Sequence, residues 1–113
     1  MLETLQRYDM HRHIIWASFL PDKVAELKAR FPLILTSILF SSVHVEPVLL
    51  ARAVQCDYVH PCWERFENPH TLLTEAWIDN VRAAGLGIIC WHEERPHVIR
   101  ELWNRGVDGI CSD

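Results

Sequence analysis

Four side chains with useful chemistry stand at or near the ends of short apolar runs: Ser18, His60, Trp91 and His92. The two imidazoles could titrate near neutral pH. The serine hydroxyl could bond a ligand, although a strand serine bonded to backbone is an equal alternative. An indole at such a position either contacts a ligand or packs in the core, as we expect of Trp77 and Trp103. Whether the four form one site depends on the elements that carry them.

The cysteines are spread along the chain without a CxxC motif: Cys56, Cys62, Cys90 and Cys111. The sequence shows no basic segment followed by an apolar stretch, which would mark a secretion signal. We therefore expect a cytoplasmic protein whose thiols are reduced core residues. Cys56, His60 and Cys62 could also be metal ligands. However, residues 57–60 are typical of a strand, in which alternate side chains face opposite ways, and this disfavours a zinc site.

The composition is that of one globular domain, with 113 residues of which 50% are hydrophobic and 23% charged. The apolar fraction excludes a disordered chain. The longest uncharged run, residues 31–45, is too short and too polar for the roughly 20 apolar residues of a membrane-spanning helix. A net charge of -4, with acidic and basic residues interspersed, argues against a nucleic-acid partner.

Helix-type and β-type segments alternate along the chain. Val24, Leu27 and Phe31 recur at i, i+3 and i+7, which predicts a helix over residues 22–30. A second apolar stripe runs from Leu73 to Ala84, and a third contains Ile99, Leu102 and Trp103. The candidate strands are residues 13–18, 33–38, 57–60, 86–91 and 109–112.

Proline and glycine mark the same boundaries. Pro21, Pro47 and Pro96 each stand at an expected first helical turn, and Gly85 and Gly106 each follow a helical segment. The run after Gly85 is continuously apolar, which is typical of parallel strands covered by helices. The sequence therefore predicts an α/β fold, a parallel β/α repeat of about five strands. Periodicity alone leaves an open sheet and a partial barrel as alternatives, and no nucleotide-binding glycine motif is present.

The residues at the strand ends occur in a characteristic order. A strand ending in Ser18-Phe19 comes early, a strand ending in Trp91 comes late, and residues 106–113 read Gly-Val-Asp-Gly-Ile-Cys-Ser-Asp. This order resembles the C-terminal half of the glycerophosphodiester phosphodiesterase family, with its Ser-Phe and Trp-Thr strand ends and its closing Gly-Val-Asp-Gly-Ile-x-Thr-Asp. The resemblance implies a partial TIM barrel containing roughly the fourth to the eighth strand. Residues 1–113 would then be a single partial domain, truncated at both ends.

The resemblance also implies an activity, the metal-dependent hydrolysis of glycerophosphodiesters to an alcohol and glycerol 3-phosphate. A divalent cation, magnesium or calcium, would neutralise the phosphoryl charge while a histidine pair does the acid–base work. The family motifs that carry these groups precede the Ser-Phe strand. We therefore expect no catalytic residue and no metal ligand on this chain, and no activity from the chain alone.

Two short segments look like those motifs but lie in the wrong places. Residues 11–13, His-Arg-His, precede a strand and lack the glycine of His-Arg-Gly. Residues 26–28, Glu-Leu-Lys, follow the Ser-Phe strand, and their helical stripe is expected to leave Glu26 and Lys28 on solvated flanks. The family's Thr after the late Trp is replaced by His92, followed by Glu93 and Glu94, which we expect to begin a helix.

The resemblance gives the strand-end residues roles in substrate binding. The family Trp lines the substrate pocket, so Trp91 would contact the glycerol backbone or the alcohol group. Ser18 would offer its hydroxyl to a phosphate oxygen. His60 and His92 complete the predicted substrate-binding set, and neither is expected to be the catalytic base. Asp113 also lies near a strand end.

A non-catalytic half-barrel is the alternative function. Two open sheet edges and inward side chains such as Ile14, Ile89 and Ile110 would then need a partner, either a second copy in a homodimer or the missing N-terminal half. A third alternative is an unrelated β/α domain that binds a small phosphorylated ligand.

Overall fold

The computed structural model describes residues 14–63 and 65–111. Five parallel strands alternate with helices, as the sequence predicts. The strands are β1 (Ile15–Ser18), β2 (Leu35–Phe40), β3 (Tyr58–Pro61), β4 (Gly87–Trp91) and β5 (Gly109–Cys111). The helices are α2 (Pro21–Arg30), α3 (Pro47–Val54), α4 (Glu75–Ala83) and α5 (Pro96–Asn104), with a 3-10 turn, η2 (Pro69–Leu72), before α4.

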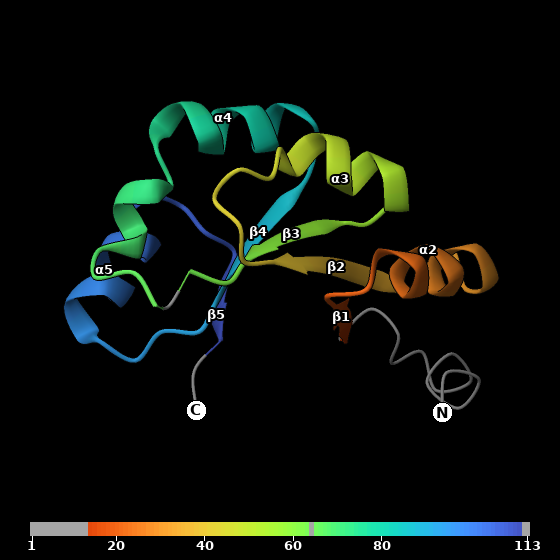
Figure 1. Cartoon of the computed structure of the whole chain (residues 1–113), viewed down its shortest axis with the longest axis horizontal. Helices are drawn as coiled ribbons and strands as arrows, with labels where there is room; N and C mark the ends of the chain where they lie inside the picture. The colour runs from red at the N-terminus through yellow and green to blue at the C-terminus, as the bar shows by residue number, and fades with distance from the viewer. Residues whose placement is uncertain (1–13, 64, 112–113) are drawn as a thin grey trace.

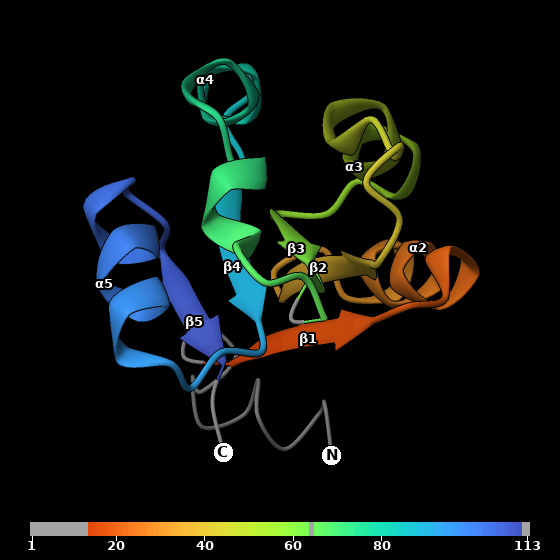
Figure 2. The ribbon, with the colours of Figure 1, turned by 60° about the vertical axis from the view of Figure 1, so that its left-hand side comes forward.

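The strands lie side by side in their sequence order, β1-β2-β3-β4-β5 (Figure 1). Helices α2 to α5 are arranged around the outside of the curved sheet (Figure 2). A doubly wound sheet would carry helices on both faces, whereas here the described helices cover one. The fold is therefore a half-barrel, and of the two alternatives that periodicity left open the partial barrel is confirmed.

The main core lies between the sheet and the helices. Ile38, Val59 and Ile88 are in register on β2, β3 and β4, and all three are fully buried. They belong to the same buried cluster as Val24 of α2 and Val98 of α5. Because side chains alternate along a strand, the residues directly before and after these three on their own strands face the concave inner side of the sheet.

The predicted boundary residues act as expected. Pro21, Pro47 and Pro96 are the first residues of α2, α3 and α5. Gly85 and Gly106 follow α4 and α5 with φ of 78° and 90°, in the left-handed region that glycine tolerates best. Helices α2, α3 and α5 therefore begin where the sequence predicts, and α4 and α5 end where it predicts.

At the amino ends of the strands, two aspartates make equivalent bonds. Asp57 Oδ2, just before β3, accepts hydrogen bonds from the Thr36 backbone N–H of β2 (2.8 Å) and from Lys28 Nζ of α2 (2.7 Å). Asp108 Oδ2, just before β5, accepts from the Ile88 N–H of β4 (2.7 Å) and from Arg82 of α4 (2.7 Å). Each carboxylate therefore ties its own strand to the preceding strand and to the helix before that one. We call these two groups the aspartate clamps.

Three local expectations are wrong. The Lys28 side chain is only 15% exposed, because it bonds Asp57 and the Ile34 carbonyl instead of lying on a solvated flank. Trp103 is 62% exposed, because Val98 and Leu102 are the buried residues of α5. Glu93 and Glu94 precede α5 and do not begin it, since the helix starts at Pro96.

Some of the predictions concern residues 11–13, Ser112 and Asp113, which lie outside the described part of the chain. Strand β2 (Leu35–Phe40) begins and ends two residues later than the predicted 33–38, and Leu73 lies ahead of α4. Among the described helices, none is long and apolar enough to span a membrane.

Candidate functional site

The carboxyl ends of the strands meet at one end of the half-barrel, where barrel enzymes place their active sites. Ser18 and Trp91 are the last residues of β1 and β4. His60 is the next-to-last residue of β3, and His92 directly follows β4. The topology thus places all four predicted substrate-binding residues at this end, although in different surroundings.

Trp91 lies on the concave side of this end. Its side chain is 39% exposed, and its indole makes an edge-to-face contact with the Phe19 ring, with ring centroids 6.0 Å apart. Phe19 is itself 48% exposed. Phe19 follows an edge strand and Trp91 ends a strand three places away, so the contact depends on the curvature of the sheet. A core role would bury the indole, and this one is partly open to solvent.

His92 continues the row of rings. Its imidazole centroid is 6.1 Å from that of Trp91, at an interplanar angle of 62°. Its Nε2 lies 3.4 Å from Glu94 Oε1. The peptide bond between Trp91 and His92 is cis. Rings of Phe19, Trp91 and His92 therefore form one aromatic row that ends at a carboxylate.

Ser18 has a local structural partner. Its Oγ accepts a hydrogen bond from the Leu20 backbone N–H at 3.0 Å, in the turn that leads into α2. The alternative that this hydroxyl bonds backbone is therefore realised. The O–H of Ser18 is not used in that bond, because the oxygen acts there as the acceptor.

His60 is buried, with only 4% of its surface exposed. Its Nδ1 lies 3.3 Å from Ser37 Oγ on β2, and its Nε2 lies 3.7 Å from Cys111 Sγ on β5. Burial lowers the pKa of His60 from its usual 6.5 to about 4, so the imidazole is neutral at physiological pH. From β3, His60 thus contacts side chains of both β2 and β5.

Glu93 is a residue that the sequence interpretation misplaced. It is 5% exposed, and its carboxylate accepts hydrogen bonds from the guanidinium of Arg95, whose Nη2 lies 2.7 Å from Oε2. The bond from Arg95 lowers the pKa of Glu93. Arg95 also donates to the backbone carbonyls of Phe66 (3.3 Å) and Glu67 (2.8 Å). This pair holds the loop after β4 against the loop after β3.

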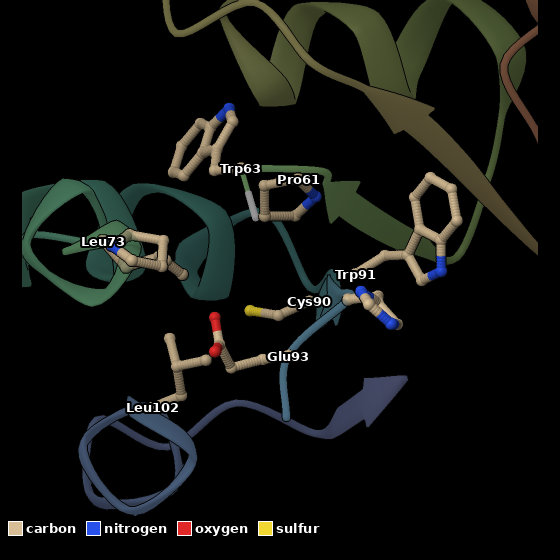
Figure 3. Close-up of a pocket in the computed structure, with 9 residues that line it drawn as sticks. Pro61, Trp63, Leu73, Cys90, Trp91, Glu93 and Leu102 are labelled. Atoms are coloured by element: carbon tan, nitrogen blue, oxygen red, sulfur yellow. The ribbon is translucent and has the colours of Figure 1, made fainter. Parts of the chain in front are cut away.

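A small cavity lies behind this end of the sheet, on the helix side. Cys90 and Glu93 point toward it, whereas the Trp91 indole points away (Figure 3). The cavity measures about 20 Å³ and is lined by apolar side chains such as Trp63, Leu73 and Leu102. A space of this size holds about one water molecule, so it is not where a substrate would bind.

The described residues do not fit a divalent metal. Hard cations need several carboxylate or carbonyl oxygens. Asp57 and Asp108 lie in the aspartate clamps at the opposite end, and Glu93 is bonded to Arg95. No three His, Cys, Asp or Glu residues of the described ranges gather as ligands. Cys56, Cys62 and Cys90 are buried, as predicted, whereas Cys111 is partly exposed.

Comparison with known proteins gives structural matches only. No family model matches the chain, and no curated protein matches it in sequence. A protein assigned as a glycerophosphoryl diester phosphodiesterase from Silicibacter pomeroyi matches with a TM-score of 0.78 and 20% identity, over 98% of this chain and 38% of its own. A glycerophosphodiester phosphodiesterase from Parabacteroides distasonis gives a TM-score of 0.72 and 17% identity, over 99% and 44%.

A third match carries a ligand. The Oleispira antarctica phosphodiesterase, solved in complex with its product sn-glycerol-3-phosphate, gives a TM-score of 0.71 and 17% identity, over 87% of this chain and 37% of its own. The chain spans about two-fifths of the length of the structures it matches. At these identities the likeness concerns the fold. The resemblance seen in the strand-end motifs is thus confirmed at that level: the chain has the fold of part of a glycerophosphodiester phosphodiesterase barrel.

Proposed function

We propose that the chain is the C-terminal half of a metal-dependent glycerophosphodiester phosphodiesterase, which hydrolyses its substrates to an alcohol and glycerol 3-phosphate. The observation that carries the proposal is the partly exposed Trp91 at the carboxyl edge of a half-barrel with this fold. Trp91 and Phe19 would form an apolar wall against the glycerol or alcohol part of the substrate. Ser18 would donate its O–H to a phosphate oxygen.

In this proposal the reacting groups come from outside the described residues. Phosphodiester hydrolysis needs a base for the attacking oxygen and an acid for the leaving alkoxide. His60 is buried on Ser37 and Cys111, and Glu93 is buried on Arg95, so neither reaches a substrate. When bound, a magnesium or calcium ion would neutralise the phosphoryl charge, and we assign its ligands to the other half of the barrel. Four free thiols favour a cytoplasmic location.

The first prediction concerns the chain alone. We expect it to release no choline from glycerophosphocholine, with or without magnesium or calcium, because we assign the acid, the base and the metal ligands of the reaction to the other half of the barrel. The measurement is enzymatic detection of free choline over hours. Metal-dependent release above the blank, abolished by Trp91→Ala, would contradict the assignment of the chemistry to the other half.

A fused barrel tests the proposed function directly. The amino-terminal strands of the Parabacteroides distasonis enzyme would be joined to this chain, replacing the part that it matches. We expect metal-dependent turnover from the fusion and a loss of about tenfold with Trp91→Ala, the equivalent of about 1.4 kcal/mol of binding to the transition state. Trp103→Ala is the matched control, because that indole is exposed on the outer helix α5. A fusion that unfolds cooperatively but turns nothing over would count against the proposal.

The non-catalytic alternative has its own structural support. Ile15, Phe19 and Trp91 are large apolar side chains at least 38% exposed. The expected set is partly wrong, because Ile89 is 8% exposed and Ile110 packs against the helix-side core. A second copy of the chain could cover the exposed set, which light scattering would detect as twice the mass of one chain. A monomer at micromolar concentration would exclude the homodimer.

A further inference from the structure

A buried ion pair tethers the loop that follows β4. Glu93 is 5% exposed, and its two carboxylate oxygens accept hydrogen bonds from Nε and Nη2 of Arg95. The Arg95 guanidinium also donates to the backbone carbonyls of Phe66 (3.3 Å) and Glu67 (2.8 Å), in the loop after β3. A guanidinium is a rigid planar fork, so it can serve several acceptors at once only when they lie at fixed positions. The pair therefore fixes where the two loops lie relative to each other.

His92 lies between two anchored residues. Before it, Trp91 is paired with Cys111 in the ladder between β4 and β5, and after it the Glu93 N–H donates to the Cys111 carbonyl at 3.0 Å. The Glu93 carboxylate points toward the small cavity on the helix side, whereas the Trp91 indole points away from it (Figure 3). The imidazole of His92 lies beside that indole, and 30% of its side chain is exposed. The placement of this imidazole therefore depends on where Glu93 is held.

We propose that Glu93 and Arg95 are positioning residues, which hold the His92 imidazole beside Trp91 at the candidate substrate site. The importance of this positioning for a reaction rests on the proposed function, whereas the positioning itself rests on the contacts of this chain. Both residues act through the backbone of residues 92–95 and not by touching a substrate. The loop after β3 takes part, because its two carbonyls hold the guanidinium on the side opposite to the carboxylate.

An apolar pair would stabilise these loops equally well. A buried ion pair adds little net stability, because the cost of removing two charges from water offsets their attraction. The cavity beside Glu93 is lined by Leu73 and Leu102, so Glu93→Leu would place an apolar side chain among apolar neighbours. An apolar pair lacks direction, however, because only hydrogen bonds fix the distances and angles between the two loops. Geometry is therefore the property that the charged pair supplies.

Two variants separate positioning from stability. Arg95→Met leaves the buried Glu93 carboxylate without its counter-charge, so it should lower the urea midpoint of unfolding. The double variant, Glu93→Leu with Arg95→Met, removes both charges, so it should recover most of that loss while the directional bonds remain absent. Arg82→Met is the matched control, because it also breaks an arginine–carboxylate bond, to Asp108, but at the amino end of the half-barrel.

The first measurement is made on the chain itself, by nuclear magnetic resonance. Overhauser effects between aromatic protons report the contacts of Trp91 with Phe19 and with His92. In the double variant we expect the contact with Phe19 to persist, because the strand ladder holds Trp91, and the contact with His92 to be lost. Arg82→Met should keep both contacts. A folded double variant that keeps the contact between Trp91 and His92 would overturn the proposal, and it decides the matter even if Arg95→Met alone unfolds.

The fused barrel measures the consequence for the reaction. The double variant should raise KM about tenfold and leave kcat within about twofold, because it misplaces a predicted substrate-binding residue. A loss of folded protein alone would lower kcat and leave KM unchanged, as we expect of Arg82→Met.

Two outcomes separate this inference from the proposed function. An active fusion in which the double variant loses the contact between Trp91 and His92 but keeps its KM would overturn the role of the pair in the reaction. A folded fusion that turns nothing over would count against the proposed function, and the ring contacts of the chain would still decide whether Glu93 and Arg95 position His92.

Discussion

The two ends of the half-barrel use their polar and aromatic residues in opposite ways. At the amino end, Asp57 and Asp108 each accept bonds from a backbone N–H and from a basic side chain. At the carboxyl end, on the concave side, Trp91 and Phe19 remain partly exposed. The two aspartates at the amino end therefore stabilise the fold, whereas the exposed aromatic side chains at the carboxyl end form the candidate site.

The closing motif, residues 106–113, has a structural role through Asp108. Asp108 belongs to the closing motif of the family resemblance, yet its carboxylate accepts a hydrogen bond from the Ile88 N–H and pairs with Arg82. A buried backbone N–H without a partner costs roughly 1–3 kcal/mol, so such a bond stabilises the connection between neighbouring strands. The motif is thus a requirement of the β/α repeat, which agrees with the general division of barrels into a stability end and an active end.

Asp57→Ala tests the amino end and is expected to have the largest effect among the changes to the aspartate clamps, His60 and Trp91. It removes the partner of the Lys28 ammonium, whose side chain is only 15% exposed, and of the Thr36 N–H. Lys28 keeps its bond to the Ile34 carbonyl but loses its counter-charge, and the Thr36 N–H loses its acceptor, so the free energy of unfolding should fall by about 3 kcal/mol. Urea denaturation followed by circular dichroism measures the change.

Asp79→Ala is the control for that experiment, because Asp79 is exposed on α4. Its free energy of unfolding should change by no more than about 0.5 kcal/mol. If Asp57→Ala behaves in the same way, then the aspartate clamps do not stabilise the fold, and the contrast between the two ends fails.

His60, buried on the concave face near the carboxyl end of β3, is expected to give the next largest effect, through pH. Its pKa is lowered from 6.5 to about 4 in the folded state by burial, so the unfolded chain takes up the proton first as pH falls. Stability should therefore decrease as pH falls from about 6.5 toward 4, by about 2 kcal/mol between pH 7 and pH 5. Measuring the free energy of unfolding across this range gives the slope.

His60→Gln should remove that slope, while His44→Gln, at an exposed position, should preserve it. Glu93 contributes little to this slope, because Arg95 lowers its pKa and its contribution is lost as pH falls from the usual carboxyl range down through the lowered pKa, mostly below pH 5. An unchanged slope in His60→Gln would mean that the folded imidazole titrates normally.

The elements of the fold could be predicted because their signals are local. Pro21, Pro47 and Pro96 fix helix starts, and Gly85 and Gly106 fix helix ends, whatever the rest of the chain does. Parallel strands then follow from the continuous apolar runs. The family resemblance selected the barrel over an open sheet, since periodicity is the same in both.

The site could be predicted only in part because its contacts are between distant segments. The Ser18-Phe19 motif was visible, but the contact of Phe19 with Trp91 needs the curvature of the whole sheet. The sequence predicts Lys28 on a solvated flank because helical periodicity shows which face of the helix a residue lies on. It does not show that Asp57, 29 residues away, bonds the lysine. Glu93 was expected to favour a helix start, whereas tertiary bonds to Arg95 and beyond decide its position.

The carboxyl end is expected to give the smallest effect on stability, through Trp91→Ala. The indole is 39% exposed and its recorded ring contacts are edge-on, with Phe19 and His92, so its loss should cost about 1 kcal/mol. Trp63 is the matched comparison: it is 4% exposed and packs against Phe40 and Trp77, so Trp63→Ala should cost about 3–5 kcal/mol. Urea denaturation of both variants measures the difference. Equal losses would make Trp91 a core residue, and the aromatic row would then have no surface to offer a substrate. A small loss for Trp91→Ala, together with the loss of turnover expected in the fused barrel, would mean that the indole is kept for a substrate, because packing alone would not account for it.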